Sequence, residues 1–186
     1  MRQAFALLGA SVVLVAACGG GNDGPRAEQD LAPLRAAAAL APCPAAVGDV
    51  PSLTLPCLGG GPDVRLDGAA TGVPTLVNVY GSWCGPCQKE MPVLAAFARR
   101  AGSKVALLGV DTEDEARLAL LFARDVGQHW PAVVDDEGTF MRHYGPGPPL
   151  TLFVDRAGKV AFVHRGPFAS LGDLVAAVSR RLGVAV

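Results

Sequence analysis

Residues 83–87 have the sequence Trp-Cys-Gly-Pro-Cys, and this stretch decides the fold. An apolar run typical of a strand precedes it at residues 75–80, and a helical pattern follows it at residues 88–100. This order places Cys84 at a helix N-terminus, where free N–H groups and the helix dipole stabilise a thiolate. The thiolate is the attacking species in disulfide exchange, so we predict that Cys84 is a nucleophile. Cys87 lies one helical turn further on and would resolve the mixed disulfide by attacking Cys84.

A Cys-x-x-Cys pair can instead be a structural disulfide or half of a zinc site. A zinc site needs two further ligands. Cys43 and Cys57 do not have the required spacing, and His129, His143 and His164 are scattered along the chain. We therefore predict no metal and no cofactor, and a redox-active disulfide between Cys84 and Cys87.

The bulk composition is that of an ordinary globular chain. Its 186 residues are enough for one domain with an apolar core. The formal net charge is -1, and only 6% of the residues are aromatic. Nucleic-acid binding would call for a basic surface and stacking aromatic side chains. We therefore predict no nucleic-acid partner.

The N-terminus has the pattern of an export signal. Arg2 is followed by an uncharged, mostly apolar run at residues 4–17, which is too short for a stable membrane span but suits a signal peptide. The run ends in Leu-Val-Ala-Ala before Cys18, which resembles the bacterial lipobox, in which the cysteine is acylated. We predict a lipoprotein signal at residues 1–18 and lipidation of Cys18. An ordinary cleaved signal and a retained anchor are the alternatives.

A linker is predicted between this signal and the folded domain. Residues 19–30 are rich in glycine and polar residues, which is typical of a flexible tether. Residues 31–40 can form a short helix with Pro33 in its first turn. We assign residues 19–46 to the tether and this helix, and residues 47–186 to the domain.

The number of cysteines indicates how the remaining ones are paired. The chain has five cysteines, of which Cys18 is assigned to lipid and the Cys-x-x-Cys pair to redox chemistry. An exported protein meets an oxidising compartment, so we predict a structural disulfide between Cys43 and Cys57. Closing that loop is worth about 3 kcal/mol on the chain-entropy model. Two buried free thiols or a second redox pair are the alternatives.

The apolar pattern predicts an α/β fold with a mixed central sheet, helices on both faces and an N-terminal hairpin. A parallel strand at residues 105–110 and a helix at 114–126 follow the first strand–helix unit. A hairpin at residues 150–164 and a helix at 170–182, with Ser170 as its N-cap, close the domain. The predicted strands lie at residues 64–66, 76–80, 105–110, 132–134, 150–154 and 160–164. The prolines between residues 42 and 56 predict irregular structure there.

Four segments together resemble the thioredoxin superfamily and, more narrowly, the extracytoplasmic thiol-disulfide oxidoreductases of the TlpA/ResA type. Residues 78–92, Asn-Val-Tyr-Gly-Ser-Trp-Cys-Gly-Pro-Cys-Gln-Lys-Glu-Met-Pro, carry most of the resemblance. The strand at residues 105–111, Trp-Pro-Ala-Val-Val-Asp at 130–135 and Pro-Leu-Thr-Leu-Phe-Val-Asp at 149–155 complete it. The resemblance covers residues 47–182 and implies a thioredoxin-like three-layer fold.

The resemblance also implies roles for residues around the cysteine pair. Glu90 would be a buried carboxyl that tunes the pair and relays a proton, unless it only stabilises the helix start. Asn78 stands where cytoplasmic thioredoxins carry a buried aspartate, and it cannot titrate. Pro149 would follow a cis bond and bind substrate beside the cysteines. Pro148 departs from the pattern because it has no N–H to offer a substrate. Trp83 would cover one side of the pair, or serve as ordinary packing.

These observations predict a membrane-tethered, extracytoplasmic thiol-disulfide oxidoreductase. Gly85-Pro86 between the cysteines resembles reducing thioredoxins, so we expect a reductant of protein disulfides. The family resemblance implies apocytochrome c as a substrate and a membrane electron-donor protein as a partner. A disulfide-forming oxidase is the main alternative. A thiol peroxidase is disfavoured because Gly81 replaces its threonine, and a non-enzymatic binding lipoprotein is the fourth hypothesis.

Overall fold

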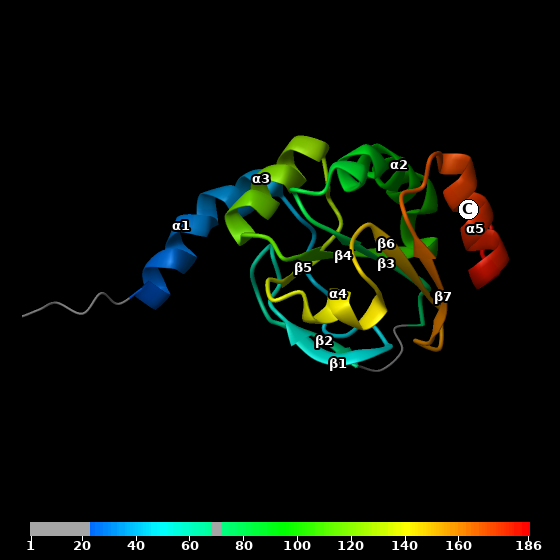
Figure 1. The fold of residues 1–186 in the computed structure, drawn as a ribbon, viewed down its shortest axis with the longest axis horizontal. Helices are drawn as coiled ribbons and strands as arrows, with labels where there is room; N and C mark the ends of the chain where they lie inside the picture. Colours follow the sequence, from blue (N-terminus) through cyan, green and yellow to red (C-terminus); the bar gives the residue numbers. More distant parts are fainter. Residues whose placement is uncertain (1–22, 68–71) are drawn as a thin grey trace, which may run out of the picture.

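The computed structural model of the chain describes residues 23–67 and 72–186. The predicted signal at residues 1–18, including Cys18, lies outside the described residues. The elements follow one another as shown in Figure 1: α1 Asp23–Ala38, β1 Asp49–Leu55, β2 Val64–Asp67, β3 Thr75–Tyr80, α2 Gly85–Ala101, the 3-10 turn Gly102–Lys104, β4 Ala106–Thr112, α3 Ala116–Val126, β5 Ala132–Asp135, α4 Thr139–Tyr144, β6 Leu150–Val154, β7 Val160–Arg165 and α5 Leu171–Leu182.

Strand β3 lies at the centre of a five-stranded sheet of order β5-β4-β3-β6-β7. It pairs in parallel with β4 and antiparallel with β6. All six of its residues are buried, as expected for an apolar strand covered on both faces. Cys84 follows shortly after the C-terminal end of this central strand.

Two apolar layers sandwich the sheet. Helices α2 and α5 cover one face, while α4 and the β1–β2 hairpin cover the other (Figure 1). Tyr80, Phe97 and Phe153 belong to the first layer, and Val79 and Phe140 belong to the second. The prediction of a mixed sheet with helices on both faces and an N-terminal hairpin is confirmed.

Strand β1 corrects the expectation of irregular structure between residues 42 and 56. It spans Asp49–Leu55 and includes Pro51. Its antiparallel pairing with β2 shifts register between residues 49 and 54. A proline fits a strand at such an irregularity because its missing N–H breaks no regular ladder bond. The number of prolines in this segment does not indicate that Pro51 fits into a strand in this way.

Helix α1 is longer than the sequence predicts. It begins at Asp23, so Pro33 lies inside it and not in its first turn, and residues 23–30 of the predicted tether are helical. Leu31, Leu34 and Ala38 pack against α3 and β5. This burial of apolar side chains offsets the helix-breaking effect of the proline.

A disulfide closes the loop between α1 and β2. Cys43 and Cys57 are joined with a Cα–Cα distance of 6.0 Å. The segment around Cys57 runs along the outer edge of β5, because the N–H of Leu58 donates to the carbonyl of Ala132 at 2.8 Å. The N–H of Val134 donates to the carbonyl of the residue before Cys57 at 2.9 Å. The cross-linked segment therefore covers a sheet edge that would otherwise expose unpaired backbone groups.

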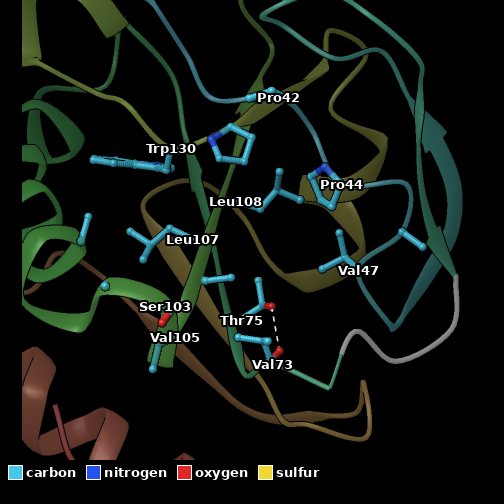
Figure 2. A pocket seen from close by; sticks show the side chains of 15 residues that line it. Pro42, Pro44, Val47, Val73, Thr75, Ser103, Val105, Leu107, Leu108 and Trp130 are labelled. Atoms are coloured by element: carbon cyan, nitrogen blue, oxygen red, sulfur yellow. Dashed lines mark hydrogen bonds between the residues drawn. The ribbon is translucent and has the colours of Figure 1, made fainter.

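An apolar pocket of about 500 Å³ opens at the N-terminal end of the parallel strands (Figure 2). Leu107, Leu108 and Trp130 line it, together with residues from the segments before β1 and β3. None of the described residues that line it carries a titratable side chain. It lies at the opposite end of β3 from Cys84, so it takes no part in the site described next.

Candidate active site

The cysteine pair occupies the start of α2. Cys84 is the N-cap of the helix and forms a disulfide with Cys87. Pro86 suits the first turn, because its missing N–H would have had no partner within the helix. The N–H of Cys87 donates to the sulfur of Cys84 at 3.2 Å. Cys84 is 3% exposed and Cys87 is fully buried.

This geometry suits disulfide exchange. After reduction, the Cys84 sulfur would lie at the N-terminus of α2, where the backbone N–H of Cys87 and the helix dipole favour the thiolate. Cys87 is one turn inside the helix and already within bonding distance of Cys84 in the oxidised form. The spacing of the pair therefore allows Cys87 to close the disulfide with Cys84.

A buried carboxyl, Glu90, lies on the same side of α2 as Cys87. It is 1% exposed. Its Oε1 accepts the backbone N–H of Phe168 at 2.9 Å, and its Oε2 accepts the side-chain amide of Asn78 at 3.2 Å. The Asn78 amide also donates to the hydroxyl of Thr151 at 3.0 Å. Burial raises the pKa of Glu90, and these two hydrogen bonds only partly offset the effect.

Replacement of Glu90 by glutamine is expected to change both stability and rate. The folded-state pKa of Glu90 is raised, so the unfolded chain loses this proton more readily and stability falls as pH rises towards the folded-state pKa. Glu90→Gln should lessen that decline between pH 5 and pH 8, as measured by denaturant unfolding of the oxidised protein. Exchange should slow by at least about tenfold if the carboxyl moves a proton during resolution by Cys87.

Asp63→Asn is the matched control, because Asp63 is an exposed carboxyl in the turn before β2 and does not line the surroundings of the cysteines. It should leave the pH dependence of unfolding and the exchange rate unchanged. An unfolding profile of Glu90→Gln that parallels the wild-type profile would contradict a raised pKa for Glu90. An unaltered rate would assign Glu90 to structure alone.

The two consecutive prolines lie beside the start of the cysteine segment. Val79 pairs with Leu150 in the β3–β6 register, which brings Pro149 to the C-terminal end of β3. The Pro148–Pro149 peptide bond is cis, and Pro149 is buried. The carbonyl of Pro149 accepts the N–H of Gly166 at 2.9 Å. A substrate backbone thus finds no N–H donor at these two residues.

The loop after β4 holds the segment that leads into Cys84. The indole N–H of Trp83 donates to the carbonyl of Glu113 at 3.0 Å. The backbone N–H of Ser82 donates to Oδ2 of Asp114 at 2.6 Å. Trp83 nevertheless remains 53% exposed, so it flanks the cysteine pair and presents an apolar surface to solvent.

The sequence interpretation missed a hollow beside Trp83. It has a volume of about 630 Å³ and includes Leu118, which is 45% exposed. Its full lining is Ser82, Trp83, Glu113, Asp114, Glu115, Leu118, Asp136 and Glu137. The one available signal was the acidic run at residues 113–115 directly after a buried strand. Among the described residues, no three His, Cys, Asp or Glu side chains are grouped so as to hold a metal ion.

Comparisons with known proteins agree with this geometry. A model of the Redoxin family matches residues 46–178. The DsbE thiol:disulfide interchange protein of Xylella fastidiosa is 34% identical over 119 residues, which are 62% of this chain and 59% of that protein. The ResA thiol-disulfide oxidoreductase of Geobacillus thermodenitrificans is 33% identical over 94 residues, which are 48% of this chain and 53% of that protein. The chain therefore spans less than two thirds of the length of these curated relatives.

The solved structure of MTB dsbF has the same fold. It superposes with a TM-score of 0.60 and 26% sequence identity, and the match covers 70% of this chain and 98% of that one. The residues that the Redoxin model matches, 46–178, include the cysteine pair, Glu90 and the prolines before β6.

Proposed function

Because the chain belongs to the Redoxin family, we propose that it is an extracytoplasmic thiol-disulfide oxidoreductase that reduces protein disulfides. The observation that carries the proposal is the Cys84–Cys87 disulfide at the N-terminus of α2, with the buried Glu90 carboxyl on the same helix. The names DsbE and ResA describe interchange proteins and oxidoreductases of this kind. The direction of electron flow and the substrate are part of the proposal.

The reaction balances as two exchanges. The Cys84 thiolate attacks one sulfur of a substrate disulfide, so a mixed disulfide forms and the other substrate sulfur leaves as a thiolate. The Cys87 thiol loses its proton and attacks the Cys84 sulfur, which releases the second substrate thiolate and closes the Cys84–Cys87 disulfide. Both substrate thiolates take up protons. Each cycle consumes two electrons, which a membrane electron-donor protein would return to the pair.

The midpoint potential of the Cys84/Cys87 pair tests the reducing direction. Gly85-Pro86 between the cysteines resembles reducing thioredoxins, whose potential is about −270 mV, whereas a strong oxidase has about −120 mV. We expect a value nearer to −270 mV, measured by equilibration with glutathione or dithiothreitol buffers. A value nearer to that of the oxidase would favour the alternative function, the formation of disulfides in exported proteins.

Replacement of Cys87 by serine is expected to trap substrates. Without the resolving thiol, the mixed disulfide on Cys84 persists, so partner proteins should remain covalently attached. The complexes are isolated from the cell envelope and the attached partner proteins are released with a reductant. Mass spectrometry then identifies these partner proteins. We propose that apocytochrome c is among them, as the family resemblance implies. The double variant with Cys84→Ser is the control and should trap nothing, and the absence of any adduct on Cys87→Ser would contradict the mechanism.

The proposed location rests on the N-terminal sequence. Cys18 would carry lipid and hold the domain at the outer side of the bacterial cell membrane. Within residues 23–67 and 72–186, no helix has the length and apolar character needed to cross a bilayer. Metabolic labelling with a fatty acid tests the anchor: wild-type protein should take up label and Cys18→Ser should not.

A thiol peroxidase of the redoxin type is disfavoured by Gly81. Such enzymes carry a threonine three residues before the nucleophile. A Cβ atom at position 81 would lie 2.6 Å from the indole nitrogen of Trp83 and 3.2 Å from the carbonyl of Thr112. A side chain here would displace Trp83 from its contact with the loop after β4. Rapid peroxide consumption by the purified protein would contradict this assignment.

A further inference from the structure

A row of three polar side chains crosses the central sheet next to Glu90. Asn78 of β3 lies opposite Thr151 of β6, and Thr151 lies opposite His164 of β7 in the antiparallel registers. Residues directly opposite each other in antiparallel strands place their side chains on the same face of the sheet. The row therefore ends at His164 on the outer strand of the sheet, beside α5 (Figure 1).

His164 is linked to Glu90 from a second direction, through Phe168. The imidazole ring of His164 stacks on the ring of Phe168, with 4.0 Å between the ring centroids and 19° between the two planes. The backbone N–H of Phe168 is the group that donates to Oε1 of Glu90 at 2.9 Å. Phe168 belongs to the loop that joins β7 to α5, where no helix or strand fixes the backbone. The stack therefore holds the residue whose backbone binds the carboxyl.

The surroundings of His164 favour a neutral ring that acts by stacking. Its Nε2 is buried and forms no hydrogen bond with any group of the residues that the structure describes. Burial lowers the pKa of His164, so the ring carries no charge at pH 7. The charged side chains that line the pocket next to this ring are Asp173, Arg180 and Arg181 from α5. The contact that remains for the imidazole within the domain is the stack on the neighbouring aromatic ring.

We propose that His164 is a positioning residue for Glu90, because its ring holds Phe168 and the N–H of Phe168 holds the carboxyl. The other carboxyl oxygen, Oε2, is held by Asn78, whose amide also donates to the hydroxyl of Thr151. His164 thus lies at the outer end of both sets of contacts, and its effect on the cysteine pair is indirect. Its effect on disulfide exchange rests on the function proposed above, whereas its effect on Phe168 and Glu90 does not.

Amide hydrogen exchange of Phe168 tests the positioning role without reference to catalysis. His164→Val removes the ring but retains a residue that suits a strand. In the full-length oxidised protein, we expect the Phe168 N–H to exchange at least about tenfold faster in this variant than in the wild type, as measured by NMR. The N–H groups of β3 report global unfolding, and the acceleration at Phe168 should exceed theirs.

His164→Phe separates the ring from its nitrogens. It retains a ring that can stack on Phe168, and the adjoining pocket of about 380 Å³ leaves room for the larger side chain. It also removes the buried, unpartnered Nε2, so it should fold at least as well as the wild type. Its Phe168 N–H should exchange within about threefold of the wild-type rate.

His143→Ala is the matched control. The exposed ring of His143 contacts the ring of Tyr144, which packs on the opposite face of the sheet from α2. This variant also loses a contact between a histidine and an aromatic ring, but not the one at Phe168. It should leave the exchange of the Phe168 N–H unchanged.

The pKa of Glu90 provides a second readout, which a purely structural role for His164 would not move. The hydrogen bond from Phe168 lowers the pKa of Glu90 and partly offsets the effect of burial. Loss of this hydrogen bond in His164→Val should therefore raise the pKa of Glu90 further. An NMR titration of the labelled carboxyl carbon measures the shift, and His164→Phe should titrate like the wild type.

The rate of disulfide exchange is the third readout. At pH 7, kcat/KM for a peptide disulfide should fall about fivefold in His164→Val and stay within about twofold of wild type in His164→Phe. A Phe168 N–H that is accelerated no more than those of β3, an unchanged pKa of Glu90, or a His164→Phe variant as impaired as His164→Val would overturn the proposal. If His164→Val does not fold, His164→Gln, which has a polar side chain without a ring, decides by the same measurements. The expected changes at Phe168 in a protein without exchange activity would count against the proposed function alone.

Discussion

Replacement of Cys84 by serine is expected to reduce disulfide exchange to the uncatalysed background. A serine hydroxyl stays protonated at neutral pH, so the thiolate that attacks the substrate is lost entirely. The environment at the start of α2 favours an anion at this position, where the sulfur accepts the N–H of Cys87 at 3.2 Å. We expect the rate of insulin-disulfide reduction to fall by at least roughly a thousandfold, since the nucleophile cannot be replaced by binding alone.

The matched control for this variant is the double substitution Cys43→Ser/Cys57→Ser. It removes the other disulfide, which lies at the edge of β5 away from α2. Below its melting temperature this variant should retain the wild-type rate. Retention of activity by Cys84→Ser would sink the exchange mechanism and leave the non-enzymatic binding module as the better hypothesis.

The sequence predicts the parts of the fold that depend on neighbouring residues. The apolar run of β3 and the Gly85-Pro86 helix start are both local signals, and together they locate the cysteine pair. The β6–β7 turn is local too, because Oδ1 of Asp155 accepts the N–H groups of Ala157 and Lys159 at 2.8 and 2.9 Å. A short polar side chain that bonds the next few backbone groups is typical of turns.

Other features depend on contacts that leave no local trace. The start of α1 could not be predicted, because its path past Pro33 is stabilised by packing against α3. Strand β1 continues through Pro51 only because its pairing with β2 shifts register there. Sequence patterns describe neither a partner helix nor a register shift.

The residues around the cysteine pair also divide into those that the sequence indicates and those that only the tertiary contacts reveal. The resemblance identifies Glu90, but its main partner is the backbone N–H of Phe168, 78 positions along the chain. Any residue except proline could supply that N–H, so nothing in the sequence indicates it. The sequence shows that residues 111–115 are mostly acidic. Only the structure shows that the carboxyl of Asp111 is buried and that the carboxyl of Asp114 accepts the N–H of Ser82.

We expect that removal of the Cys43–Cys57 disulfide lowers the free energy of unfolding more than any other substitution proposed above. The bond joins two cysteines that are 14 positions apart in the chain. It fixes the segment that covers the edge of β5. In the reduced chain this loop gains freedom when the protein unfolds, which costs about 3 kcal/mol of stability on the chain-entropy model. Cys43→Ala/Cys57→Ala should therefore lower Tm by roughly 6–12 °C, a shift that calorimetry of the oxidised protein can measure.

The physical cause of this loss can be separated from a loss of packing. Cys57 is buried whereas Cys43 is only partly so, and each makes one half of the same cross-link. If the cross-link accounts for the effect, Cys43→Ala and Cys57→Ala should each lose most of the stability that the double variant loses, because either one breaks the bond. If packing dominates instead, the buried Cys57→Ala should be much the worse of the two. A double variant with an unchanged Tm would show that hydrogen bonds to β5 hold this segment without the disulfide.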